Sequence, residues 1–226
     1  KCGFLYAGQG TQRVGMGADF YDKYPAFREV FDKPELDFDL KRVCFEGPEE
    51  TLSLTAYTQP CMVAFAAGVT ELFKNAGIVP EVAAGLSLGE YSALCAAGVF
   101  NPKTAVELTA FRGKVMTEAA KGRTCSMAAV MNLDRNKLQE ARTNASSLGV
   151  CEIANYNCPG QIVIGGDTEA VNKACELAKE AGAKRCIPLK VSGPFHTSLM
   201  KPAGDALKQR FLATEFSAPH FPVIFN

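Results

Sequence analysis

The sequence predicts an α/β protein in which a large domain with a parallel sheet is interrupted by a small α+β domain. In the first part of the chain, short apolar strands lead through glycine turns into helices, as in α/β proteins. From Cys125 the order becomes strand, helix, strand, strand, helix, strand, which is the ferredoxin-like order. An amphipathic helix then returns the chain to the first domain. We therefore expect a large domain at 1–124, a small domain at 125–191 and the second part of the large domain at 192–226.

The elements of the first hundred residues follow from apolar runs and from the residues that break them. Gly8-Gln9-Gly10 ends the first strand, and Pro25 is placed to begin a second helix within a helical stretch. Pro60 opens a helix that is apolar on all sides, which is typical of a central, buried helix. The expected elements are a buried strand at 3–7, helices at 18–31, loops at 33–57, a helix at 60–75, a strand at 81–85 and a helix at 90–97.

The remaining elements begin with a helix that Asn101 caps and that has Pro102 at its first position. The last helix carries a stripe of apolar residues that is expected to face a core. The expected elements are a helix at 102–121, a strand at 126–131, a helix at 134–147, strands at 150–156 and 161–166, a helix at 168–182, a strand at 184–191, a helix at 196–213 and a strand at 221–226.

The composition excludes several classes of protein. With 226 residues, of which 47% are hydrophobic, the chain can bury a substantial core. The 24 Lys and Arg residues balance the 24 Asp and Glu residues, so that nucleic acid is a disfavoured partner. The sequence has neither a secretory signal nor a run of roughly 18 uninterrupted apolar residues, and we expect no membrane contact.

The spacing of the cysteines and histidines favours neither disulfides nor metal sites. Nine cysteines are scattered along the chain with no CxxC pair, a pattern that suits free thiols in a reducing compartment, and we expect a cytoplasmic protein. The only histidines are His196 and His220, and neither has a second ligand at metal spacing. We expect neither a metal nor another cofactor.

Gly85-Leu86-Ser87-Leu88-Gly89 is the GxSxG pattern of a nucleophile elbow. It lies between an expected strand and an expected helix, where small residues permit a sharp turn that exposes the hydroxyl of Ser87. A glycine-serine turn can also serve only as a helix cap. The position between strand and helix favours a catalytic serine.

A catalytic serine needs a base, and His196 is the better candidate of the two histidines. It is expected at the N-terminal end of the last helix, on the inward stripe with Leu199, Met200 and Ala203. A helix N-terminus disfavours the charged imidazolium and so keeps a base neutral. His220, near the end of the chain, is expected to be structural.

Arg112 lies on an apolar helical stripe that is expected to face the core. Ala105, Leu108, Arg112, Val115 and Ala119 recur at spacings of three and four residues. A buried guanidinium needs an anion as its partner. This anion is either a carboxylate of the protein or the carboxylate of a substrate, which the planar guanidinium group can bind through two hydrogen bonds. Snorkelling to the surface is a third reading.

The glycine-flanked Gln9 indicates a backbone donor at the end of the first strand. Its N–H and the N–H of Leu88, after the nucleophile, are placed to form an oxyanion hole. The same loop can be only a tight turn. It fails as a dinucleotide fingerprint because Arg13 stands where a third glycine is required.

With these motifs the sequence resembles the malonyl-CoA:acyl carrier protein transacylase family, the acyltransferases of fatty-acid and polyketide synthesis. Their order along the whole chain is far more specific than any one of them. The matching segments are Gly8-Gln9-Gly10-Thr11-Gln12, Gly15-Met16-Gly17, Gly47-Pro48-Glu49-Glu50, Thr58-Gln59-Pro60, Gly85 to Tyr91, Arg112-Gly113 and Gly193-Pro194-Phe195-His196.

The resemblance implies a role for each candidate residue. Ser87 would be acylated with His196 as its base, and Arg112 would pair with the free carboxylate of the malonyl group. The N–H groups of Gln9 and Leu88 would form the oxyanion hole. It also implies a hydrolase-like large domain with a ferredoxin-like small one, malonyl-CoA as donor and acyl carrier protein as acceptor. Gln59 lines the same cleft or is a loop residue before a helix, and malonyl and methylmalonyl both stay open as acyl groups.

The resemblance also implies a longer functional unit. Family members continue for roughly another quarter of their length, and that part supplies the backbone carbonyl that orients the histidine. This chain begins at Lys1 and ends at Asn226, within an expected strand. We therefore expect a further C-terminal segment, and the group that orients His196 stays unassigned.

Two alternatives remain at the level of sequence. An α/β-hydrolase esterase or thioesterase would share the elbow, but it would be expected to have an HGGG-type loop, which is absent here. It would also give a buried Arg112 no role. A module that binds a carrier protein or CoA without catalysis would have no need of Ser87, His196 and Arg112 together.

Overall fold

The computed structural model describes residues 1–225 and divides into two units. The first unit comprises Lys1–Lys114 together with the chain from Leu207 onward, and the second comprises Val115–Ala206. The second unit takes in the end of one helix and the segment around Phe195, because these pack into one core with its sheet. The expected domain boundaries, at 124/125 and 191/192, stay a prediction.

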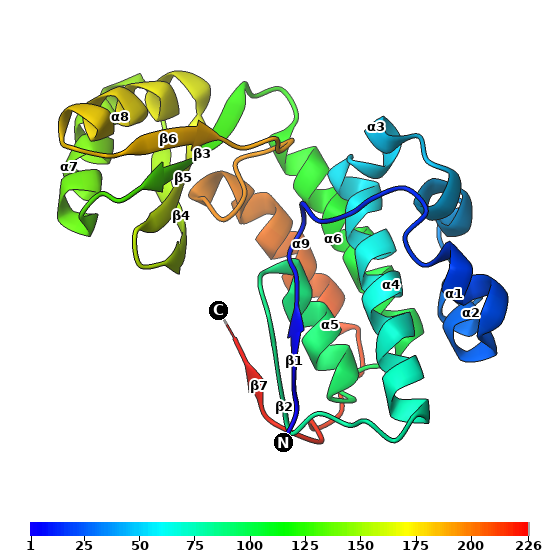
Figure 1. Ribbon diagram of the computed structural model, residues 1–226. Helices are drawn as coiled ribbons and strands as arrows, with labels where there is room; N and C mark the ends of the chain where they lie inside the picture. The colour runs from blue at the N-terminus through cyan, green and yellow to red at the C-terminus, as the bar shows by residue number, and fades with distance from the viewer. Residues whose placement is uncertain (226) are drawn as a thin grey trace. The chain divides into compact units, whose positions relative to one another are not determined.

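The first unit is built on a three-stranded parallel sheet (Figure 1). Its strands are β1 (Gly3–Tyr6), β2 (Val82–Gly85) and β7 (Val223–Ile224), in the order β1-β2-β7. All three are close to their expected positions, and both pairings are parallel. This confirms the α/β class with a parallel sheet.

The expectation that the first strand is buried is wrong for one of its faces. The side chain of Leu5 is 86% exposed. Alternate residues of a strand point to opposite faces. The hydroxyl of Tyr6 bonds to Thr70 Oγ1 at 2.8 Å, and the ring of Phe4 packs on Phe73, so Phe4 and Tyr6 face the helix α4 (Thr55–Asn75).

The helices of the first unit cover the expected segments with two corrections. The segment 33–57, expected to consist of loops, contains two short helical elements, at Arg42–Glu46 and Glu49–Leu52. The helix expected from Pro60 begins at Thr55, so that Pro60 lies inside it. A proline in the second turn leaves a single carbonyl without its helical partner, which an otherwise well-packed helix tolerates. The helical elements are α1 (Ala18–Lys23), α2 (Pro25–Asp32), the π-helical turn η1 (Arg42–Glu46), α3 (Glu49–Leu52), α4 (Thr55–Asn75), α5 (Leu88–Ala96), α6 (Pro102–Ala120) and α9 (Lys201–Leu212).

The second unit has the expected ferredoxin-like order. Its antiparallel sheet runs β4-β5-β3-β6, so that the first and third strands of the unit are central. Helices α7 and α8 lie side by side against this sheet (Figure 1) and share an apolar core with it. The elements are β3 (Cys125–Met131), α7 (Arg135–Ala145), the 3-10 turn η2 (Ser146–Leu148), β4 (Cys151–Cys158), β5 (Gln161–Asp167), α8 (Thr168–Glu180), β6 (Arg185–Pro188) and the 3-10 turn η3 (Ser198–Met200).

No helix in residues 1–225 is both long enough and apolar enough to cross a membrane.

Candidate active site

Ser87 occupies a sharp turn between β2 and α5. Its φ of 51° and ψ of −96° lie outside the regions that most residues adopt, as in the strained turn of a nucleophile elbow. A methyl group on Gly85 would lie 2.0 Å from the carbonyl carbon of Gly89, and one on Gly89 would lie 2.3 Å from Tyr6 O. The two glycines are therefore required for the turn, and the elbow predicted from the sequence is present.

Arg112 is buried and hydrogen-bonded to Ser87. The residue is 8% exposed, and its Nη2 donates to Ser87 Oγ at 3.0 Å. Arg112 takes part in none of the ion pairs found among the described residues, although the carboxylate of Glu90 interacts electrostatically with its charge. Burial lowers the pKa of Arg112. A buried cation beside a nucleophilic hydroxyl is a site prepared for an anion.

Tyr91 supports Arg112 and is a neighbour that the sequence analysis did not single out. The guanidinium carbon of Arg112 lies 5.5 Å from the centroid of the Tyr91 ring, a cation–π distance. Burial raises the pKa of Tyr91. The sequence feature that could have pointed to Tyr91 is its spacing: it follows Ser87 by four residues and so lies one helical turn further along α5.

Gln9 and Leu88 lie in segments that touch. A methyl group on Gly8 would lie 2.9 Å from Leu86 O, so the loop after β1 packs directly against the elbow. Within residues 1–225, neither the N–H of Gln9 nor that of Leu88 donates a hydrogen bond to another described residue. Both groups are available for an oxyanion, and their role stays a prediction.

Gln59 lies inside α4 and not in a loop before a helix. It is fully buried, and its Nε2 donates to Gln9 Oε1 at 3.5 Å. Of the two sequence interpretations, the loop residue is wrong because α4 begins at Thr55.

His196 belongs to the second unit, and its expected place on an inward helical stripe is wrong. It lies in a turn before η3 with a φ of 60°, and its side chain is exposed. The helix begins only at Lys201, after the 3-10 turn at Ser198–Met200, and a residue at positive φ cannot belong to a right-handed helix. Its role as the base for Ser87 stays a prediction.

His220 belongs to the first unit. Its backbone N–H donates to Ala97 O at 2.8 Å, and its ring lies against Gly98 at the end of α5. This contact fits the structural role expected from the sequence.

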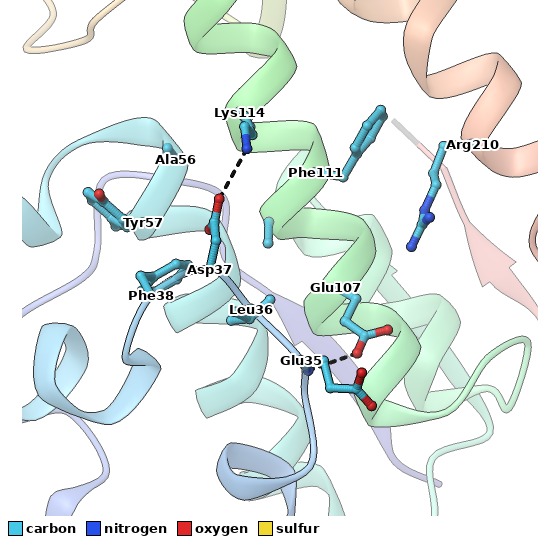
Figure 2. A pocket seen from close by; sticks show the side chains of 11 residues that line it. Glu35, Leu36, Asp37, Phe38, Ala56, Tyr57, Glu107, Phe111, Lys114 and Arg210 are labelled. Atoms are coloured by element: carbon cyan, nitrogen blue, oxygen red, sulfur yellow. Dashed lines mark hydrogen bonds and ion pairs between the residues drawn. The ribbon is translucent and has the colours of Figure 1, made fainter.

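A separate pocket of about 490 Å³ lies on another side of α6 (Figure 2). Phe111 lines it, although the next residue, Arg112, is bonded to Ser87. Lys114 pairs with Asp37 at 3.0 Å inside it. None of the predicted site residues lines this pocket, and among residues 1–225 no group of three His, Cys, Asp or Glu side chains is arranged to hold a metal ion.

A strained serine at a helix N-terminus, beside a buried arginine, defines a site for acyl transfer. In agreement, the family model described as "Acyl transferase domain" matches residues 3–224. The malonyl CoA-acyl carrier protein transacylase of Bacillus subtilis (strain 168) is 45% identical over 229 residues, covering 100% of this chain and 72% of that protein. The chain belongs to the malonyl-CoA:acyl carrier protein transacylase family.

Solved structures agree with this assignment. MCAT from Streptococcus pneumoniae superimposes with a TM-score of 0.93 at 47% identity, covering 100% of this chain and 74% of that one. The transacylase PlMCAT, solved in complex with a type II PKS acyl carrier protein, gives a TM-score of 0.93 at 39% identity, covering 99% and 74%. These matches confirm the resemblance drawn from the motifs and the fold class.

Proposed function

We propose that this chain transfers a malonyl group from malonyl-CoA to the phosphopantetheine thiol of acyl carrier protein. The relatives named above carry this activity in their names, and one of them was solved bound to an acyl carrier protein. In this proposal Ser87 carries the malonyl group and His196 is its base. The backbone N–H groups of Gln9 and Leu88 hold the oxyanion, and Arg112 binds the free carboxylate.

The reaction proceeds in two halves through an acyl-serine. In the first, Ser87 Oγ attacks the thioester carbonyl while His196 takes the hydroxyl proton. The tetrahedral intermediate collapses, the carbon–sulfur bond breaks, and CoA leaves as a thiol with the proton from His196. In the second half the phosphopantetheine thiol gives its proton to His196 and attacks the ester carbonyl. The bond between the carbonyl carbon and Ser87 Oγ then breaks, and Ser87 Oγ leaves with the proton from His196. These acid–base and covalent steps use no metal or redox cofactor.

The observation that carries the proposal is the position of the Arg112 guanidinium. The guanidinium is buried, takes part in none of the ion pairs among the described residues, and is bonded to the atom that would be acylated. In a malonyl ester a single methylene separates the ester carbonyl from the carboxylate, so the carboxylate of a malonyl-Ser87 stays within reach of this guanidinium. A guanidinium matches a carboxylate through two parallel hydrogen bonds. An esterase of neutral acyl groups has no use for such a buried charge.

We further propose a cytoplasmic location. All nine cysteines lie within the described residues and are free thiols. A protein with this many free thiols is typical of a reducing compartment.

The proposal is tested by the mass of the intact protein after incubation with malonyl-CoA or acetyl-CoA. The wild type should form an adduct with malonyl-CoA, and Ser87→Ala should form none. Arg112→Ala should lose malonyl transfer by about 10²-fold or more while keeping or gaining acetyl transfer, because the buried, unpaired charge that rejects acetyl is removed. Arg112→Lys should recover little, because an ammonium lacks the planar fork.

Two results would contradict it. One is an adduct that persists in Ser87→Ala or maps to a cysteine. The other is a parallel loss of malonyl and acetyl transfer in Arg112→Ala with a large fall in melting temperature, which would make Arg112 a structural residue.

A further inference from the structure

Thr55, the first residue of α4, holds the side chain of Gln9. It is 1% exposed, and its Oγ1 accepts a hydrogen bond from Gln9 Nε2 at 3.0 Å. Gln59, one helical turn further along α4, donates to Gln9 Oε1 at 3.5 Å. The amide of Gln9 is therefore held at both ends by two residues on one face of α4.

The backbone of Gln9 itself has few contacts to fix it, although its neighbour Gly8 packs against the elbow. Between the end of β1 at Tyr6 and the start of α1 at Ala18 there is no helix or strand. Within the described residues, no hydrogen bond joins the backbone of Gln9 to the rest of the chain. The direction of the Gln9 N–H consequently depends on two contacts, the packing of Gly8 against the elbow and the place where the Gln9 side chain is held.

The backbone of Thr55 also lies close to α6. A methyl group on Gly113 would lie 2.6 Å from Thr55 O and 2.9 Å from the Cα of Ala56. Gly113 directly follows Arg112, so α4 lies close to α6 beside the residue that bonds to Ser87. One residue thus contacts the Gln9 loop through its hydroxyl and the Arg112 helix through its carbonyl.

We infer that Thr55 is a positioning residue of the oxyanion hole. Its hydroxyl holds the Gln9 amide and thereby aims the backbone N–H of Gln9 at the oxyanion. This inference rests on the proposed function, in which that N–H stabilises the tetrahedral intermediate. An oxyanion donor that is displaced acts on the transition state and not on substrate binding, so its loss lowers kcat and leaves KM nearly unchanged.

The test compares Thr55→Val, Thr55→Ser and Thr109→Val by steady-state transfer from malonyl-CoA and by thermal unfolding. Valine keeps the shape of threonine and removes the acceptor, whereas serine keeps the acceptor. Thr55→Val should lower kcat by about 10-fold, less than the 10²–10³-fold for deleting a donor outright. Its KM should stay within about 2-fold, and Thr55→Ser should stay within about 3-fold of the wild type in kcat.

Thr109→Val is the matched control. Thr109 is also a fully buried helical threonine, but its hydroxyl bonds only to Ala105 O and Val106 O of its own helix. It should keep the wild-type kcat. Thr55→Val should also lower malonyl and acetyl transfer by the same factor, because the oxyanion is common to both substrates, while its melting temperature stays close to that of Thr109→Val.

Gln9→Leu breaks the same hydrogen bond from its other end and covers the case in which Thr55→Val does not fold. It should lower kcat to a similar degree, and the double variant should lose little more than either single one. The inference is overturned if the wild type acylates Ser87 and Thr55→Val or Gln9→Leu keeps its kcat, or if Thr55→Ser falls as far as Thr55→Val. If the wild type acylates no Ser87, the proposed function fails first and the inference fails with it.

Discussion

Two turns in this chain hold a proposed catalytic residue at a positive φ, and they are fixed by different means. Ser87 in the first unit has a φ of 51°, and His196 in the second has a φ of 60°. Such values are unusual for residues other than glycine and persist only where the surroundings impose them. At Ser87 the surroundings are backbone atoms. At His196 they are side chains.

The elbow is fixed by close approach of backbone to backbone. Gly89 lies so near the end of β1 that a methyl group there would lie 2.3 Å from Tyr6 O and 2.9 Å from Ala7 O. Leu86 N–H donates to Tyr6 O at 3.1 Å and closes the same contact. Backbone atoms of a sheet cannot move aside, so this turn depends on glycine.

The histidine turn is fixed by what its neighbours bury. Phe195 lies in a core with Met127 and Met200, and Thr197 is also buried. The hydroxyl of Thr197 donates to Pro194 O at 2.6 Å. Several side-chain contacts stabilise this turn, so we expect the loss of one of them to have a moderate effect. In the elbow, by contrast, one added methyl group should be enough to disrupt the turn.

Gly89→Ala should disrupt the elbow, and its effect should exceed that of any single substitution in the histidine turn. The methyl group has no room beside Tyr6 O, so the elbow must open or β1 must shift, at a cost of roughly 3 kcal/mol in unfolding free energy. The malonyl adduct on Ser87 should be lost. Urea unfolding and intact-protein mass after incubation with malonyl-CoA measure the two effects.

Gly204→Ala is the control for this substitution. Gly204 lies in α9, and a methyl group there would meet nothing within 4 Å. Alanine in place of glycine inside a helix should raise the unfolding free energy by about 0.5–1 kcal/mol. If Gly89→Ala were as stable and as active as Gly204→Ala, the backbone account of the elbow would be wrong.

His196→Ala should lower acyl transfer by roughly 10²–10⁴-fold, the usual contribution of a general base. Because the imidazole is exposed, its removal should change the unfolding free energy little. Transfer rates with malonyl-CoA and thermal unfolding, measured beside His220→Ala, check this. Activity that survives in His196→Ala and disappears in His220→Ala would mean that His220 is the base.

Local sequence patterns predict most of the fold because each element carries its own signal. Asn101 is expected to cap α6, and its Oδ1 accepts from the N–H of Thr104 at 2.9 Å. The predicted start of α4 is too late because a proline favours the first turn of a helix, whereas Pro60 stands inside this one. The exposure of Leu5 is not predicted because an apolar run does not reveal which face of its strand lies open.

The sequence predicts those parts of the candidate site that follow from local residue spacing. It does not predict the parts that depend on contacts between distant segments. The small residues around Ser87 and the stripe that contains Arg112 are visible within a few residues of sequence. The contacts of Tyr91 with Arg112 and of Thr55 with Gln9 join segments that are far apart in the chain or on different helices. The sequence predicts a helix start at His196 instead of a turn, because the positive φ there arises from the burial of its neighbours, which no local pattern reports.

Thr197→Val should have the smallest effect and sharpens the comparison between the two turns. The substitution keeps the buried shape and removes the hydrogen bond to Pro194 O, which should cost roughly 1–3 kcal/mol of unfolding free energy because a buried carbonyl loses its donor. Phe195 still anchors the turn, so transfer from malonyl-CoA should fall only about 3-fold, in line with the gradual response that shared side-chain packing predicts. Thr197→Ser should restore both values, and Thr143→Val, whose exposed hydroxyl bonds only to Gln139 O of its own helix, should change neither. If Thr197→Val abolished the Ser87 adduct as completely as we expect of Gly89→Ala, the histidine turn would be as intolerant as the elbow, and the distinction between backbone and side-chain support would fall.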